Sequence, residues 1–309
     1  MGLSDVAGVF SRYFVVGFFV PSFVVLVLVS QLIPAGTLPP VYADASGGAR
    51  IAIIGGASLL VGLVLVGLNY PILRLFEGYP LGGHWFTWPV YAPLVWWQAR
   101  RLKKAKLSTV APSATEIEKR NALYRLGRRF PPDVDDVLPT GFGNAIRAFE
   151  RYSKIRWGLN SIAAWPRIEM LLSTEEQQLL ADAKGNVAFF VNGSLLAALG
   201  GVALIADRIL SQSSAFPSGF LYVIPFALSG LCYWVSIEAA IAWGELVAAS
   251  IDLHRLQLYE KVGLRAPADF TDERKNIAPA FNAAVLRGTE IDDKFATNHK
   301  SAAPTNQRR

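Results

Sequence analysis

Cysteine, histidine and charge are all scarce in this chain, and each shortage excludes a class of protein. Cys232 is the only cysteine among 309 residues, so neither an intramolecular disulfide nor a cysteine-based zinc cluster can form. His84, His254 and His299 show no metal-ligand spacing, and no metal or cofactor is expected. Charged residues make up only 17% of the chain against 52% hydrophobic residues, which is too apolar for an ordinary soluble domain. We therefore expect an integral membrane protein.

Patterns of catalysis and nucleotide binding are lacking as well. No Ser, His and acid constellation stands out, and no Cys and His pair does. Gly141-Phe142-Gly143 lacks the further glycine and the lysine of nucleotide loops, so it is interpreted as a turn or the start of a helix. The net charge of +6 would suit nucleic acid, but in a membrane protein it fits basic loops on the cytoplasmic side. The sequence favours neither an enzyme nor a nucleic-acid-binding protein.

What the sequence does contain is apolar stretches long enough to cross a hydrocarbon core of about 30 Å. Pro21 is expected to kink the first, for which the alternative is a signal peptide cleaved near Ala43-Asp44-Ala45. The fourth is about 50 Å long at roughly 1.5 Å per residue, so it should continue beyond the lipid. The predicted fold is all-α, with four transmembrane helices and a helical cytoplasmic insert between the second and third. The four stretches are residues 13–33, 51–72, 187–205 and 220–253.

A tryptophan-rich segment follows the second stretch and could be mistaken for another span. It contains Pro89 and Pro93 and ends in a run of arginine and lysine, which is typical of a segment lying at the membrane interface. A re-entrant segment is the alternative. Beyond it, Ser113 with Glu116 and Ser173 with Glu176 are predicted capping boxes that open helices.

These observations divide the chain into five parts. The basic clusters and the long insert should share one side of the membrane with the C-terminal region, which places both termini in the cytoplasm. The tail after Thr289 is expected to be disordered. The parts are 1–79 with the first two spans, 80–106 as the interfacial segment, 107–186 as the cytoplasmic insert, 187–263 with the last two spans, and 264–309 as the C-terminal region.

The insert contains the most distinctive stretch, LPTGFGNAIRAFERYSKIRWGLNSIAAWPRIEMLL. Its Leu-Pro-Thr, Gly-Asn, Arg-Ala-x-Glu, Arg-Trp-Gly-Leu and Trp-Pro-Arg elements resemble a signature of uncharacterised bacterial multispanning membrane proteins. The resemblance covers residues 138–172 and implies a multi-pass protein of the bacterial inner membrane with a structured cytoplasmic insert. It implies no activity. The order of spans is also that of several oligomeric channels, which is only an analogy.

Polar residues inside the last two spans are the first candidates for a functional site. Glu238, Glu245 and Asp252 are seven residues apart, close to two helical turns, so they form one stripe along a helix. Ionisable groups in a membrane are usually functional, which favours Glu238 as a pathway residue. It lies near the membrane boundary, however, so pairing is the alternative, and salt bridges to the basic insert are expected for Glu245 and Asp252. Asn192 is a candidate polar site or a hydrogen-bonding link between helices.

Two further groups of residues are singled out. Basic side chains of the insert form a candidate surface for an anionic lipid or ligand: Arg147, Arg151, Lys154, Arg156 and Arg167. Glycines of the second and third spans are predicted packing positions, within the bundle or between copies: Gly55, Gly62, Gly200 and Gly201.

The function expected from these features is an oligomeric channel- or transporter-like protein whose fourth helix carries the acidic stripe. The alternative is a membrane-anchored interaction or regulatory protein without transport activity, in which the acids pair internally. A membrane enzyme ranks third. The expected partners are the lipid bilayer, further copies of the chain and an anionic lipid, but no nucleic acid.

Overall fold

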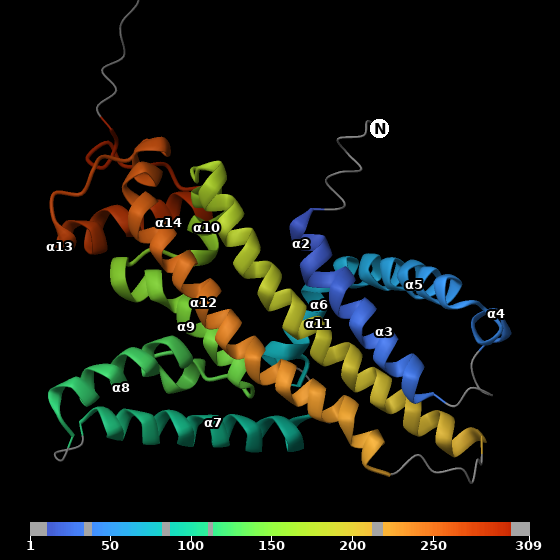
Figure 1. Ribbon diagram of the computed structural model, residues 1–309. Helices are drawn as coiled ribbons and strands as arrows, with labels where there is room; N and C mark the ends of the chain where they lie inside the picture. Colours follow the sequence, from blue (N-terminus) through green and yellow to red (C-terminus); the bar gives the residue numbers. More distant parts are fainter. Residues whose placement is uncertain (1–10, 34–38, 82–86, 111–113, 212–218, 298–309) are drawn as a thin grey trace, which may run out of the picture. The chain divides into compact units, whose positions relative to one another are not determined.

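The computed structural model describes residues 11–33, 39–81, 87–110, 114–211 and 219–297 (Figure 1). The regular elements among these residues are all helices, and the only β pairing they contain is one bridge between Leu264 and Ala296. Four of the described helices are long and apolar enough to cross a membrane. The predicted all-α fold with four membrane-length helices is therefore confirmed. These helices are Arg12–Leu32, which joins α2 (Arg12–Phe14), η1 (Val15–Phe19) and α3 (Val20–Leu32), then α5 (Gly47–Gly67), α11 (Thr174–Ser211) and α12 (Val223–Lys261).

The chain divides into two compact units. The first comprises the described parts of Met1–Ala148 and Gln178–Gly244, and the second those of Phe149–Gln177 and Glu245–Arg309. The helices α9 (Gly141–Trp157), α11 and α12 contribute residues to both. With 38 and 39 residues, α11 and α12 are each roughly 55 to 60 Å long, about twice the thickness of a hydrocarbon core. Both helices are thus longer than a membrane crossing requires, and the excess includes polar ends near Glu176 on α11 and near His254 on α12.

A widened π turn, η1, lies just before Pro21, where the sequence predicts a kink. Proline has no N–H and cannot donate to the carbonyl of Gly17, four residues earlier. The side-chain amide of Asn192 on α11 donates to that carbonyl instead, with an Nδ2 to O distance of 2.8 Å. Asn192 is buried, so the first span and α11 are linked by a hydrogen bond inside the bundle.

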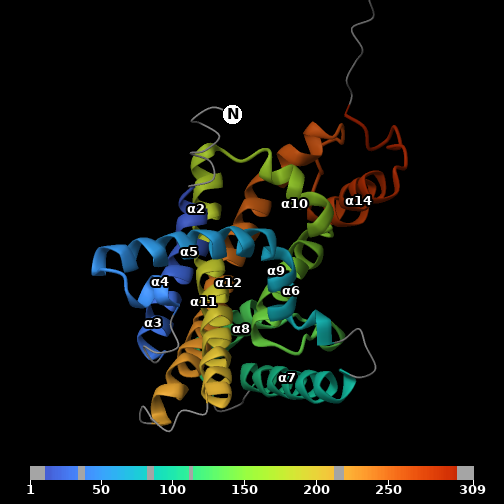
Figure 2. The ribbon, with the colours of Figure 1, turned by 90° about the vertical axis from the view of Figure 1, so that its right-hand side faces the viewer.

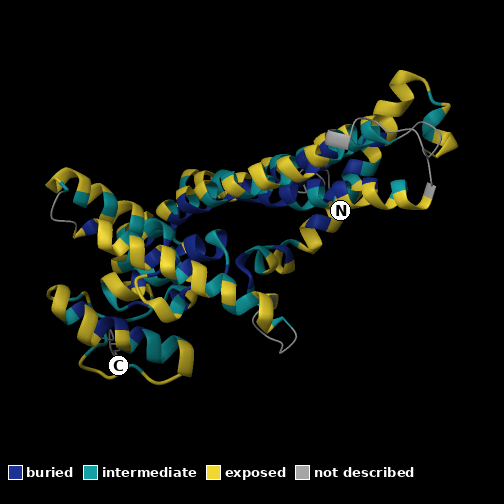
Figure 3. Cartoon of the chain, turned by 90° about the horizontal axis from the view of Figure 1, so that it is seen from below, coloured by how far each residue is buried: buried dark blue, intermediate teal, exposed yellow. Residues whose placement is uncertain are grey.

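Within the first unit, α3 and α12 both run alongside α11 (Figures 1 and 2). Small residues on α11 allow the close approach: a Cβ on Gly200 would lie 2.7 Å from Val29 of α3, and one on Gly201 would lie 2.8 Å from Phe226 of α12. Figure 3 shows many exposed residues along the long helices. A large number of them are apolar, which suits helices surrounded by lipid. The bundle is thus held by close contacts at glycine and by a few polar links.

Helices α7 (Trp88–Thr109) and α8 (Glu116–Arg129) pack against each other as a hairpin in the first unit (Figure 1). Leu102 of α7 is buried against Leu126, Phe130 and Val137. The predicted capping box of Ser113 with Glu116 is corrected here: Ser113 lies outside the described residues, and α8 begins with a box formed by Thr115 and Glu118. Residues 105–109 continue α7.

The second unit contains the shorter helices of the C-terminal region. The tail after Thr289 was predicted to be disordered, but the structure describes it as far as residue 297. Arg265 N–H donates to Phe295 O at 2.8 Å, and Thr297 N–H to Gly263 O at 2.8 Å. The remaining helices of both units are α4 (Pro40–Ala43), α6 (Asn69–Glu77), η3 (Tyr79–Leu81), η4 (Val134–Asp136), α10 (Ser161–Glu169), η5 (Gly219–Tyr222), α13 (Phe270–Asp272), η6 (Glu273–Ile277) and α14 (Ala278–Arg287).

Candidate functional site

The acidic stripe on α12 begins with Glu238, which forms an ion pair with Arg129 at the end of α8. Both side chains belong to the first unit and are about two-fifths exposed, at 44% and 39%. An ion pair of this exposure contributes roughly 0 to 1 kcal/mol. The arginine was not among the residues predicted from the sequence, although it belongs to the basic helix of the insert. Glu238 thus contacts the insert.

Asp252, two stripe positions further along, is held by neutral donors in the second unit. Its carboxylate accepts a hydrogen bond from the phenol of Tyr152 at 2.6 Å and one from the indole of Trp157 at 2.6 Å. The salt bridge expected here is therefore replaced by aromatic hydrogen bonds from α9. Burial of the Tyr152 phenol, together with the hydrogen bond to Asp252, raises the pKa of Tyr152 to about 12. Glu245, between the two acids, is exposed.

An arginine next to Asp252 extends this cluster. The Arg255 guanidinium lies 3.5 Å from the centre of the Trp157 ring, and its Nε donates to the carboxylate of Glu273 at 2.9 Å. Tyr259 donates to the same carboxylate at 3.1 Å. Glu273 is buried on the π turn η6, and burial with the adjacent carboxylate raises the pKa of Tyr259. Sequence reasoning missed this network because Glu273 lies in a polar stretch without periodicity.

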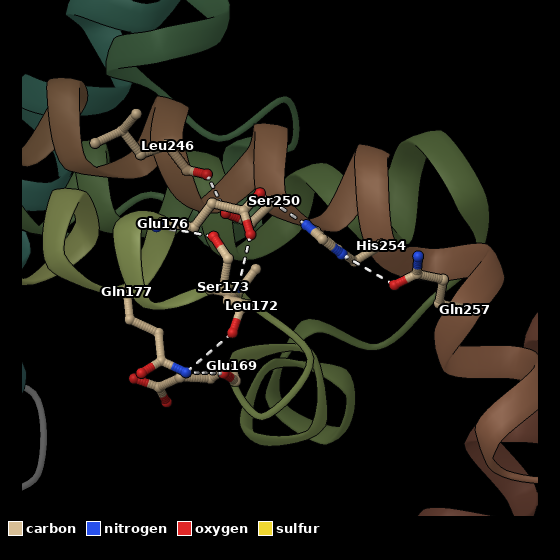
Figure 4. Close-up of polar contacts among 9 residues, drawn as sticks. All are labelled: Glu169, Leu172, Ser173, Glu176, Gln177, Leu246, Ser250, His254 and Gln257. Atoms are coloured by element: carbon tan, nitrogen blue, oxygen red, sulfur yellow. Dashed lines mark hydrogen bonds and ion pairs between the residues drawn. The ribbon is translucent and has the colours of Figure 1, made fainter.

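A second polar cluster joins the start of α11 to α12 in the second unit (Figure 4). The predicted capping box is present: Ser173 N–H donates to Glu176 at 2.8 Å, and Glu176 N–H donates to the Ser173 hydroxyl at 3.3 Å. The other oxygen of Glu176 lies 3.0 Å from Nε2 of His254. The carboxylate of Glu176 raises the pKa of His254, and the imidazole lowers the pKa of Glu176. His254 and Asp252 thus contact different elements.

The predicted basic surface is divided between the two units. Arg147 lies in the first, where its guanidinium donates to the phenol of Tyr79. The other four residues lie in the second: Lys154 and Arg156 are exposed, Arg151 is half-buried, and Arg167 donates to the carbonyl of Ala163 at 2.8 Å. The contacts of these five residues therefore do not identify a common anion-binding site.

The predicted packing glycines also differ among themselves. A Cβ on Gly62 would lie 3.4 Å from the ring of Phe14, so α5 approaches the first span closely there. Gly200 and Gly201 contact α3 and α12 as described above. A Cβ on Gly55 would meet nothing within 4 Å, so this residue provides no close approach between the described helices.

The first half of the distinctive stretch forms a junction in the first unit. Asn144 accepts a hydrogen bond from Leu138 N–H at 2.8 Å and donates to the carbonyls of Leu138 and Thr140 at 2.9 and 2.8 Å. The Thr140 hydroxyl donates to Phe76 O at 2.7 Å, at the end of α6. Gly143 must be small, because a Cβ would lie 2.4 Å from the carbonyl oxygen of Glu77. Gly141-Phe142-Gly143 is thus the first turn of α9.

The second half of the stretch forms a corresponding junction in the second unit. Gly158 ends α9 with a φ of 76°, a conformation that favours glycine. Its carbonyl accepts a hydrogen bond from Asn282 of α14 at 2.9 Å, and Asn160 N–H donates to the same side chain at 2.9 Å. The stretch therefore has a structural role in each unit. Comparisons of the whole chain with protein-family models, with curated proteins and with solved structures find no match.

Proposed function

We propose that this chain is a membrane-anchored interaction or regulatory protein, in which the membrane helices anchor a helical module outside the lipid. The observation that carries the proposal is the engagement of the acidic stripe. Glu238 pairs with Arg129, and Asp252 accepts two hydrogen bonds from aromatic side chains. These contacts attach residues of the insert to α12.

The lining of a groove in the first unit supports the same proposal. A groove of about 510 Å³ lies among α6, α11 and α12, next to Phe76, Ser194, Phe226 and Tyr233. None of its lining residues carries a formal charge, and Glu238 is not among them. A selective ion path through a membrane is normally lined by charged side chains or backbone carbonyls. This groove is therefore not an acidic conduit.

The test measures ion flux and stability on the same variants. Purified protein in liposomes should show no more K⁺, Na⁺, H⁺ or Cl⁻ flux than protein-free liposomes. Asp252→Asn places an amide N–H₂ opposite the donors of Tyr152 and Trp157, so it should cost about 1 to 3 kcal/mol of stability. Glu238→Gln should cost only about 0 to 1 kcal/mol, because the Arg129 pair is half exposed.

The competing function is the channel- or transporter-like protein expected from the acidic stripe. It predicts a wild-type flux that Glu238→Gln alters while the melting temperature stays unchanged. That outcome would overturn the proposal. Loss of stability without any flux, in contrast, would support the anchored module.

We also propose that both termini lie in the cytoplasm of a bacterial cell and that the spans lie in its inner membrane. The support is the charge of the connecting segments: exposed Arg and Lys side chains are concentrated on α7 and α8, between the second and third membrane-length helices. Self-association remains a proposal as well, supported only by the open face of α5 around Gly55.

A further inference from the structure

Helix α7 has one face covered by protein. Gln98, Leu102 and Thr109 are buried, and their spacing places them on one side of the helix, where Leu102 packs against residues that follow or belong to α8. Leu102 is the apolar residue that this face contributes to the core of the hairpin. The remaining apolar residues of α7 need another explanation.

The opposite face of α7 exposes large apolar side chains. Trp96, Trp97 and Leu107 are 56%, 50% and 61% exposed, and at 100° per residue Trp96 and Leu107 lie about half a turn from the buried stripe. Each tryptophan is paired with the arginine one turn later: the Arg100 guanidinium lies 4.0 Å from the centre of the Trp96 ring, and that of Arg101 lies 4.8 Å from Trp97. Aromatic rings and cations thus alternate on this face.

The charge of this face has one sign. Arg100, Arg101, Lys103 and Lys104 are exposed, and the sequence of α7 contains no Asp or Glu. Lys106, in contrast, donates to the carbonyl of Pro132 at 2.8 Å and so contributes to the hairpin. Helix α8 is also basic, but Glu116 and Glu118 occupy its first turn and it contains no tryptophan. A merely solvated basic helix would resemble α8 and would not expose two indoles.

We propose that the outward face of α7 is a docking surface for anionic phospholipid headgroups. The indoles of Trp96 and Trp97 occupy the level between headgroups and acyl chains, where amphipathic rings are most favourable. Arg100, Arg101, Lys103 and Lys104 bind the phosphates and attract lipids of negative charge. The surface belongs to the same unit as the membrane-length helices, and the proposal holds whether or not the protein transports anything.

The test uses the full-length chain in nanodiscs that contain equal amounts of phosphatidylcholine and phosphatidylglycerol. Bromine atoms on the acyl chains of only one lipid quench the tryptophans that the lipid contacts. The contribution of Trp96 and Trp97 is the difference between the wild type and Trp96→Phe/Trp97→Phe. Brominated phosphatidylglycerol should quench this contribution several-fold more effectively than brominated phosphatidylcholine, and the excess should decrease as salt is added.

A matched pair of variants separates the surface from general charge. Lys103→Gln/Lys104→Gln removes two cations of the surface without touching either indole, and the excess quenching by the anionic lipid should be largely lost. Arg120→Gln/Arg125→Gln removes two exposed cations of α8 and should leave it unchanged. Equal quenching by both lipids, equal loss in both variants, or indoles shielded from both lipids by a protein partner or a second copy would each overturn the proposal.

Discussion

Each ring nitrogen of His254 lies near one side-chain oxygen atom, and both contacts favour the charged form of the imidazole. Nε2 lies 3.0 Å from Glu176 and Nδ1 lies 3.3 Å from the side-chain oxygen of Gln257. Two acceptors require an N–H on each ring nitrogen, which only the imidazolium has. The pKa of His254 is raised by the Glu176 carboxylate, so the protonated form binds the capping box more strongly. The attachment of α11 to α12 in the second unit is therefore sensitive to pH.

Stability should decrease as the pH rises through the raised pKa of His254. The contribution is complete below the pKa of an unfolded histidine, about 6.5, because both states are then protonated. It is lost above the folded pKa, where neither is. The melting temperature of the wild type should therefore fall by a few degrees between about pH 6 and about pH 8.5, more than that of His254→Gln.

The difference between these two proteins is the measurement, because other groups titrate in both. Glu176→Gln is a less specific variant, since it also weakens the cap on Ser173. Identical pH profiles for the wild type and His254→Gln would show that the contact with Glu176 contributes nothing to stability in solution.

Contacts between distant residues were the least predictable feature at this scale. The stripe of Glu238, Glu245 and Asp252 follows from helical geometry, but geometry does not name partners more than 90 residues away. Tyr152 and Trp157 bind Asp252 across sequence separations of 100 and 95 residues. The capping box of Ser173 with Glu176 could be predicted because it is local.

At the scale of elements, α11 packs against its two neighbouring helices through glycines on two of its faces. Gly200 permits contact with α3, and Gly201 permits contact with α12. Because lipid provides no hydrophobic drive for helix association, close packing has to provide the attraction. Widening one such contact should therefore loosen the bundle.

Gly200→Ala and Gly55→Ala form a matched pair. The added methyl at Gly200 would lie 2.7 Å from Val29, so it should destabilise the protein by roughly 1 to 3 kcal/mol through overpacking. The methyl at Gly55 meets nothing within 4 Å and should be neutral or slightly stabilising. Thermal unfolding in detergent is the measurement. Equal melting temperatures for the two variants would contradict the close contact at Gly200.

The membrane-length helices were predicted well because hydrophobic runs of this length have few alternatives. Their ends were predicted less well. The second span was expected to run from 51 to 72, but α5 ends at Gly67 and α6 begins at Asn69. The break lies at Leu68, between the two helices, and Pro71 has no N–H to donate to the carbonyl of Gly67, four residues earlier.

At the scale of the whole molecule, the proposed orientation can be tested by labelling single cysteines. Cys232 is first replaced by alanine. Gly48→Cys, where a side chain has open space, should react with an impermeant thiol reagent in intact cells. Ser108→Cys, exposed on α7, should react only after the membrane is permeabilised. Labelling of Ser108→Cys from outside would reverse the assignment of the insert to the cytoplasm.

The link between Gly17 and Asn192 also has a consequence for biosynthesis. The two residues are 175 positions apart, and protein synthesis adds about 5 to 20 residues per second. The first span is therefore made roughly 9 to 35 s before Asn192, which donates to its Gly17 carbonyl. During that interval the side chain of Asn192 is not yet there to bind the Gly17 carbonyl. Arg12–Leu32 therefore gains this hydrogen bond only after α5 and the first part of α11 have been made.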